Sequence, residues 1–142
     1  MPEPPAASAA RGAILSPGEG DFMAFCDTPH LDVTIKVGAR QNSSSMEMGT
    51  ARLAAGTSNF GRHRVDEIIY FVAGQGFASI ADDRTPVRPG STMFIPRNIR
   101  HGFENSGSDV LEFVWVTSPT GFEQGLRSVG VPSLSQCKSR PK

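Results

Sequence analysis

The chain has 142 residues, 38% hydrophobic and 20% charged, which is enough to bury the core of one ordinary domain. Its 14 basic residues balance its 14 acidic ones, so it lacks the basic surplus expected of a nucleic-acid-binding protein. No apolar run approaches the roughly 20 residues of a membrane span, and we therefore expect neither nucleic acid nor a membrane as a partner.

The first segment, residues 1–12, is predicted to be a disordered arm because it is rich in proline and alanine and has little to bury. It also lacks the basic start and apolar stretch of a secretory signal. Cys26 and Cys137 lie near opposite ends without C-x-x-C spacing, which argues against a disulfide framework and against a cysteine metal site. A reducing, cytoplasmic compartment fits these features best.

Residues 13–130 are predicted to form a single domain of short strands. In chain order, the expected strands are Phe22–Phe25, Leu31–Val37, Ser45–Ala54, Glu67–Ala73, Gly76–Ala81, Thr85–Val87, Ser91–Pro96, His101–Asn105 and Asp109–Thr117. About nine to eleven closely spaced strands with turn signals between them are typical of an all-β sandwich or barrel.

Gly121–Val129 is the one stretch that reads as a helix. Thr120 is a suitable N-cap, and Glu123 three residues later would complete a capping box. Residues 131–142 lack periodicity and are predicted to be a flexible tail.

Two spaced motifs carry the candidate chemistry. Their marked positions are His63, Glu67 and Gly74 in the first, and Gly90, Pro96, His101 and Asn105 in the second. Side chains two or four apart on a strand share a face, so His63 and Glu67 face the same way if the strand runs unbroken between them. His101 would face them from a later strand. Two imidazoles and one carboxylate suit a divalent metal, Fe(II) above all, with Mn, Ni, Co and Zn as alternatives.

The two motifs resemble those of the cupin superfamily. Two positions differ from the family motifs: Gly61 stands where the family has its first histidine, and Asn98 stands where a glycine is usual. Over residues 18–130 the order of segments is similar to that of single-domain, quercetinase-like cupins. The resemblance implies an all-β double-stranded β-helix, the cupin jelly-roll barrel, with a short C-terminal helix. It further implies a metal held by His63, Glu67 and His101, and a homodimer.

Strand alternation predicts an apolar, aromatic cavity beside these ligands. Its candidate substrate-binding side chains are Met48, Phe71, Phe103, Phe113 and Trp115. Each of them taken singly is explained by barrel core, but the set favours a flat or hydrophobic ligand with a few oxygen donors. Two further readings stay open at this stage. Asn59 is a weak oxygen ligand or a turn residue, and Arg97 and Arg100 form a cationic rim or are solvated charges.

The leading functional hypothesis is a metal-dependent oxygenase that acts on a small aromatic or enol-bearing molecule bound in the barrel. Glu67 is its candidate catalytic residue, either as a permanent metal ligand or as a base. One alternative keeps the metal but not dioxygen, as in a Lewis-acid isomerase, cyclase or lyase. Another is a non-enzymatic binding protein in which Gly61 marks a decayed metal site.

Overall fold

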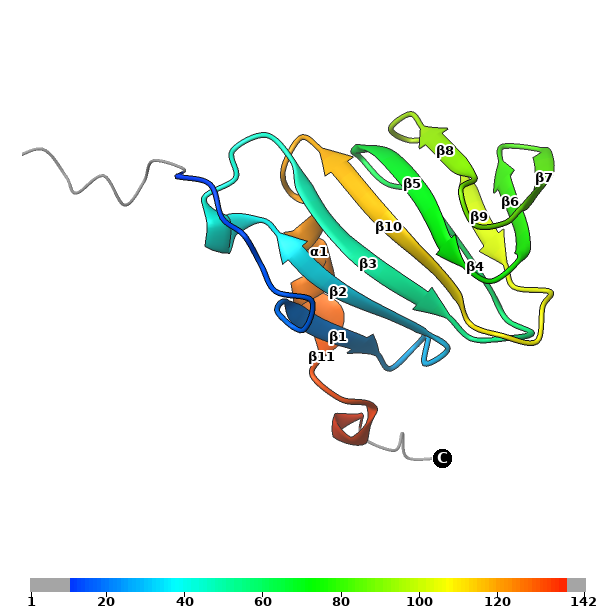
Figure 1. The fold of residues 1–142 in the computed structure, drawn as a ribbon, viewed down its shortest axis with the longest axis horizontal. Helices are drawn as coiled ribbons and strands as arrows, with labels where there is room; N and C mark the ends of the chain where they lie inside the picture. Colours follow the sequence, from blue (N-terminus) through cyan, green and yellow to red (C-terminus); the bar gives the residue numbers. More distant parts are fainter. Residues whose placement is uncertain (1–10, 138–142) are drawn as a thin grey trace, which may run out of the picture.

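The computed structural model describes residues 11–137, and its strands form two antiparallel sheets (Figure 1). The larger sheet has the order β11-β1-β2-β3-β10-β5-β8 and the smaller one β4-β9-β6-β7. The strands are β1 (Asp21–Phe25), β2 (Leu31–Val37), β3 (Glu47–Leu53), β4 (Ser58–Gly61), β5 (Asp66–Ala73), β6 (Gly76–Ile80), β7 (Asp83–Val87), β8 (Thr92–Ile95), β9 (His101–Glu104), β10 (Leu111–Ser118) and β11 (Gly130–Val131). The helical pieces are α1 (Phe122–Val129) and two short 3₁₀ turns, η2 (Ala39–Gln41) and η3 (Leu134–Gln136). The predicted all-β fold with a short C-terminal helix is confirmed.

The core lies between the two sheets and follows from strand alternation. Every second residue of β10 is buried, namely Leu111, Phe113, Trp115 and Thr117. Trp115 packs directly on β3, where a Cβ on Gly49 would lie 2.4 Å from the indole ring. A glycine is therefore required at that position for the tryptophan to take its place in the core.

The alternation of β3 differs from the prediction for Met48. Glu47 and Gly49 are the buried positions of this strand, so Met48 between them lies on the opposite, outer face. From the sequence, Met46 and Met48 are predicted to form an inward-facing stripe, because both are apolar and Glu47 between them is charged. The structure shows that the charged Glu47 is the residue that faces inward. Its carboxylate is buried because α1 supplies partners for it.

Helix α1 is confirmed within a residue of the predicted range, but the predicted capping box is wrong. Gly121 is the N-cap residue, and it has no side chain to cap with. The carboxylate of Glu47 on β3 instead accepts hydrogen bonds from the backbone N–H groups of Gly121, at 3.1 Å, and Glu123, at 2.8 Å. A side chain 76 residues away thus satisfies the free donors at the helix N-terminus.

Residues 130–137 are tied to the barrel, whereas the sequence predicts a flexible tail from residue 131. Gly130 and Val131 pair with Phe25 and Ala24 of β1, and the chain then turns through η3. Directly after η3, Cys137 forms a disulfide with Cys26. The prediction of unpaired cysteines is therefore wrong, because 111 residues of separation conceal that β11 brings the two side chains together.

Two predicted segments extend beyond the described residues. Of the predicted arm, residues 1–10 lie outside them, as do residues 138–142 of the predicted tail. Within residues 11–137, no helix is long and apolar enough to cross a membrane.

Candidate metal centre

His63 lies on the connection between β4 and β5 and not on a strand, because β4 ends at Gly61 and β5 begins at Asp66. The unbroken strand assumed from the sequence is therefore absent. The connection is held by a hydrogen bond from the backbone N–H of Asn98 to the carbonyl of His63, at 2.6 Å. Asn98 has a φ of 67°, the left-handed region that asparagine tolerates better than most residues, which explains how it replaces a glycine there.

Glu67 projects from β5 into the barrel and is 5% exposed. Its Oε1 atom accepts no hydrogen bond within the described residues, although it lies 3.3 Å from Nε2 of His101. Thr117, the partner of Glu67 on β10, also has a buried hydroxyl without a partner. Buried polar atoms without partners cost free energy, so both point to a missing polar species in this part of the barrel.

His101 projects from β9 and is 3% exposed. Its Nδ1 atom lies 3.0 Å from the carbonyl oxygen of Ile99. Since a carbonyl only accepts, Nδ1 carries the proton in the neutral ring and Nε2 presents its lone pair towards Glu67. A backbone carbonyl that fixes the tautomer in this way is a common feature of histidine metal ligands.

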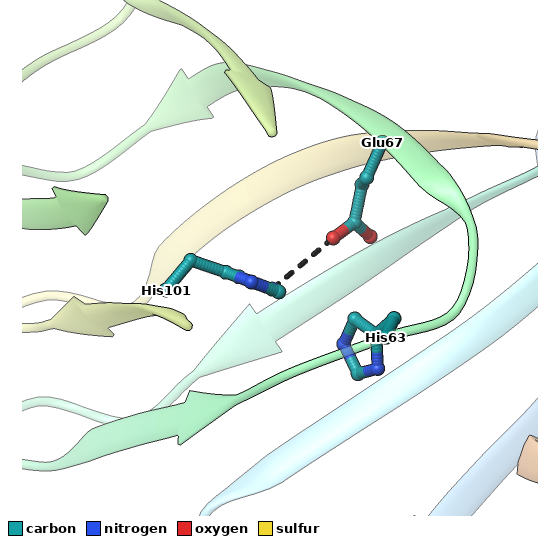
Figure 2. A group of neighbouring side chains, drawn as sticks. All are labelled: His63, Glu67 and His101. Atoms are coloured by element: carbon teal, nitrogen blue, oxygen red, sulfur yellow. Dashed lines mark ion pairs between the residues drawn. The ribbon is translucent and has the colours of Figure 1, made fainter. Parts of the chain in front are cut away.

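The three side chains converge in the barrel (Figure 2). One donor atom from each of His63, Glu67 and His101 lies within 4.8 Å of the others. Figure 2 shows the His101 ring pointing at the Glu67 carboxylate, with His63 close to both on the connection that leads into β5. The partnerless carboxylate oxygen and the two-imidazole, one-carboxylate donor set both fit a divalent cation, which these three residues would hold.

Burial and charge set the protonation of the two imidazoles in opposite directions. Burial lowers the pKa of His63, and the nearby Glu67 only partly opposes this. Burial also lowers the pKa of His101, but the adjacent Glu67 carboxylate and the hydrogen bond to Ile99 outweigh it, so the pKa of His101 is raised. In the metal-free protein, a proton therefore binds more readily to His101, beside Glu67, than to His63.

Gly61 leaves space beside this centre. It is paired with His101 across β4 and β9. A Cβ on Gly61 would contact only the ring of His63, at 3.6 Å, which is an ordinary van der Waals distance. A side chain at position 61 would thus start beside the ring of His63, at the strand position that pairs with His101.

The asparagine of the second motif has a structural role. Asn105 is 2% exposed, and its amide donates to the carbonyls of Leu53, at 2.9 Å, and Asp109, at 2.8 Å. Its Oδ1 accepts from the backbone N–H of Gly107. Asn105 therefore joins the end of β9 to the end of β3 and fixes the strand that carries His101.

A cavity of about 240 Å³ lies against the centre and includes His63, Glu67 and His101 in its wall. Of the predicted substrate-binding residues, Phe103, Phe113 and Trp115 line it. Phe71 does not, because it is fully buried in the core, and Met48 lies on the outer face. The predicted aromatic cavity thus exists, with three of its five predicted side chains.

The rest of the cavity wall is not predicted from the sequence. Phe25 and Leu31 come from β1 and β2, and Phe122, Leu126 and Val129 come from one face of α1. The helical spacing of the last three was a usable signal for an apolar face, but nothing local shows which cavity that face covers. Phe122 reaches the centre itself, since its ring lies 4.8 Å from that of His63.

The charged residues beside the motifs lie away from the cavity. Arg97 forms an ion pair with Asp66 at 3.1 Å, and Arg100 stacks over the ring of Phe60. Within residues 11–137, no lysine or arginine lines the cavity. Of the two interpretations, solvated charge fits these arginines better than a cationic rim.

Asn59 does line the cavity, and its side chain makes no hydrogen bond within residues 11–137.

Comparison with known proteins agrees with this geometry. Residues 49–117, which include all three candidate ligands, match the Cupin domain family. The structure is similar to that of KdgF from Halomonas, with a TM-score of 0.67 and 18% identity over 80% of this chain and 98% of that one. It is also similar to a predicted oxalate decarboxylase from Thermotoga maritima, with a TM-score of 0.63 and 19% identity over 76% and 100%.

In sequence, the chain is 28% identical to an uncharacterized protein of Streptomyces coelicolor over 76 residues, or 53% of this chain and 72% of the other. The two-sheet fold and the matched domain define a small β-barrel with a candidate metal centre. The chain thus has the cupin fold, and its residues 49–117 match the Cupin domain family.

Proposed function

We propose that this protein is a member of the cupin superfamily and a metal-dependent oxygenase that acts on a small aromatic or enol-bearing molecule bound in the barrel. The observation that carries the proposal is the position of two imidazoles and one carboxylate at the wall of an apolar, aromatic cavity. A bound divalent ion, Fe(II) in the first place, would supply Lewis acidity and the capacity to activate dioxygen. Three protein ligands leave room for the substrate at the same ion.

The cavity wall supports an uncharged, flat substrate. Its volume of about 240 Å³ exceeds the ~150 Å³ apolar cavity that accepts a benzene ring. No cationic side chain within residues 11–137 lines it to balance a carboxylate or phosphate. Phe103 and Phe113, stacked with ring centroids 4.4 Å apart, provide an aromatic wall for the body of the molecule.

The polar side chains of the wall have separate tasks in this proposal. His63, Glu67 and His101 would hold the ion, and the hydrogen bond of Nδ1 to the Ile99 carbonyl leaves Nε2 of His101 available for it. The Glu67 carboxylate could also accept a proton from a substrate hydroxyl. Asn59 has a free amide with which to orient an oxygen at the other end of the substrate.

The test is elemental analysis followed by oxygen uptake. We expect about one metal per chain in freshly purified protein, and consumption of dioxygen with incorporation of ¹⁸O from ¹⁸O₂ when the Fe(II) protein is given small phenols or enols. A protein that stays metal-free after growth in added Fe, Mn, Ni, Co and Zn would contradict the proposal and support a ligand-binding protein. Its thermal stabilisation by the same compounds would then be the remaining signature.

A metal-dependent, non-oxidative isomerase, cyclase or lyase is the second candidate, because the same three side chains and the carboxylate base would serve it equally. The predicted oxalate decarboxylase among the similar structures shows the fold only, at 19% identity. Turnover under strict anaerobiosis separates the two, since only the non-oxidative reaction continues without dioxygen.

We further propose a homodimer formed through the outer face of β5 and β8. Phe94 is 61% exposed, and its cross-strand partner Ile68 is 47% exposed. Tyr70 and Val72 extend the same exposed face along β5. Such a contiguous apolar patch at the edge of a sheet suits a second copy, which would cover the free edge of β8 as well.

The cytoplasmic location is also retained as a proposal. The disulfide removes the argument from unpaired cysteines, since a reducing compartment would keep Cys26 and Cys137 as thiols. Rapid alkylation in lysed cells measures this directly. Two modified cysteines per chain would support the cytoplasm, and full protection would contradict it.

A further inference from the structure

The helix α1 forms one side of the mouth of the cavity. Phe122, Leu126 and Val129 line the cavity from a single helical face. Phe122, at the first turn, contacts the rings of both His63 and Trp115 deep in the barrel. Val129, at the last turn, is 66% exposed although it lines the same cavity. The cavity therefore opens to solvent at the C-terminal end of α1.

The start of the connection between β1 and β2 forms another part of the cavity wall, next to α1. Phe25 and Thr28 line the cavity there, and Cys26 lies between them in the chain with an exposed side chain. The segment after α1 runs back along β1 and leads to Cys137, which is bonded to Cys26. The disulfide thus links the segment that follows α1 to the connection between β1 and β2, where Phe25 and Thr28 line the cavity.

The two ends of α1 are held in different ways. At the N-terminal end, the 3% exposed carboxylate of Glu47 accepts two backbone hydrogen bonds. At the C-terminal end, the attachments include the packing of partly buried Leu126 against the core, a partly exposed ion pair from Arg127 to Asp21, the short pairing of β11 and the disulfide. Gly121 has a φ of 128° and open space where a Cβ would be, so it suits a pivot next to the buried anchor.

We propose that the Cys26–Cys137 disulfide is a redox-operated clasp that holds α1 closed over the cavity. When the bond is reduced, the C-terminal end of α1 loosens about its Glu47 anchor and the mouth widens. A dithiol reductant performs the change, because one of its thiolates attacks a cysteine sulfur and its second thiol releases the mixed disulfide. One S–S bond breaks and one forms, and two protons pass to the cysteine thiols.

The location of the bond supports a reversible role. Cys26 is exposed and Cys137 is half-buried, so a reductant reaches the sulfur atoms without unfolding the barrel. Exposed disulfides are more often the labile ones, whereas structural disulfides resist reduction. The described core does not involve either cysteine.

The single tryptophan provides a readout that needs neither metal nor substrate. Trp115 is 2% exposed, lines the cavity and contacts Phe122 of α1. We expect the rate constant for acrylamide quenching of its fluorescence to rise at least about twofold when the metal-free protein is reduced with dithiothreitol. Thiol titration must show two free cysteines at the same time. The double variant Cys26→Ser, Cys137→Ser should match the reduced protein and not respond to the reductant.

Hydrogen exchange distinguishes a disulfide that restrains only α1 from one that stabilises the whole barrel. With the disulfide reduced, we expect faster amide exchange confined to residues 122–137 and to the adjacent β1, with β5 and β10 unchanged. Unchanged quenching and exchange in fully reduced protein would overturn the proposal. Faster exchange throughout β5 and β10 would also overturn it, because the bond would then support the whole barrel. Neither outcome bears on the metal centre.

Discussion

At the scale of single residues, the centre depends on three donor atoms supplied by three different parts of the chain. His63 comes from a connection, Glu67 from β5 and His101 from β9. Because one carboxylate oxygen is left without a partner, a cation is the species that would complete their bonding. The properties of each side chain can therefore be tested through metal binding.

Replacement of His101 by alanine should abolish stoichiometric metal binding, because it removes one of only three ligands. Loss of a group that only hydrogen-bonds to a metal ligand lowers metal affinity by roughly 10- to 100-fold, and we expect a larger decrease here because the ligand itself is removed. Elemental analysis after dialysis measures this. His30→Ala is the matched control, since His30 bonds to the carbonyl of Ser58 and lies outside the centre, so its metal content should be unchanged.

The pH dependence of metal affinity follows from the pKa directions. His101 has a pKa above its ordinary value of 6.5, so a proton competes with the metal as soon as the pH falls through that raised value. Affinity should be flat above it and fall about tenfold per pH unit below it. His63 has a lowered pKa and adds a second proton only at more acidic pH.

The free energy of unfolding of the metal-free protein should change in the opposite direction to the metal affinity over the same pH range. Protonated His101 is stabilised by Glu67 in the folded state, so this contribution to folding is complete below pH 6.5 and lost as the pH rises through the raised pKa. Chelator competition and urea unfolding measure the two trends. Parallel changes in affinity and metal-free stability would contradict this assignment.

Gly61→His should add a fourth ligand. The position faces the ring of His63 with only ordinary contacts, so the backbone need not move. We expect metal affinity to rise by at least about tenfold, while exogenous imidazole should lose its ability to bind the metal-loaded protein. Gly61→Ala adds only a methyl group and should change neither quantity. Equal imidazole binding by Gly61→His and the parent would show that the space is not at the ion.

At the scale of elements, α1 is held by a charge from another strand. Glu47 is a buried carboxylate with two backbone donors, and glutamine offers only one acceptor oxygen and turns an N–H₂ group towards the helix. Glu47→Gln should destabilise the fold by about 1.5–3 kcal/mol, as measured by urea unfolding. Glu112→Gln on the outer face of β10 should stay within about 0.5 kcal/mol of the parent.

At the scale of the whole molecule, the exposed face of β5 and β8 determines the assembly that we propose. Phe94→Asp should shift the protein from dimer to monomer in sedimentation, because it places two like charges against each other across a symmetric interface. Phe22→Asp changes a comparably exposed phenylalanine on β1, outside this face, and should leave the dimer intact. A parent protein that is monomeric at high concentration would contradict the homodimer.

Local pattern determined most of the architecture and the donor set. Alternation and turn residues mark the strands, and the spacing of the two motifs selects His63, Glu67 and His101, since these signals depend on neighbours within a few residues. The same reasoning placed Phe103, Phe113 and Trp115 at the cavity correctly. The prediction for Met48 is wrong because charged residues are expected on the outer face of a strand, whereas Glu47 is buried on the inner face of β3.

The tertiary structure alone decided what depends on residues far apart in the chain. In the folded chain, His63 lies on a connection between β4 and β5 and not on the strand that carries Glu67. The N-terminus of α1 is capped by Glu47 from β3, and Cys26 is bonded to Cys137. Each of these features is a contact between segments whose separation in sequence carries no periodic signal. The sequence thus defined which side chains could bind a metal and part of the aromatic cavity, and only the folded chain showed that α1 completes the cavity wall, because that contact joins segments far apart in the chain.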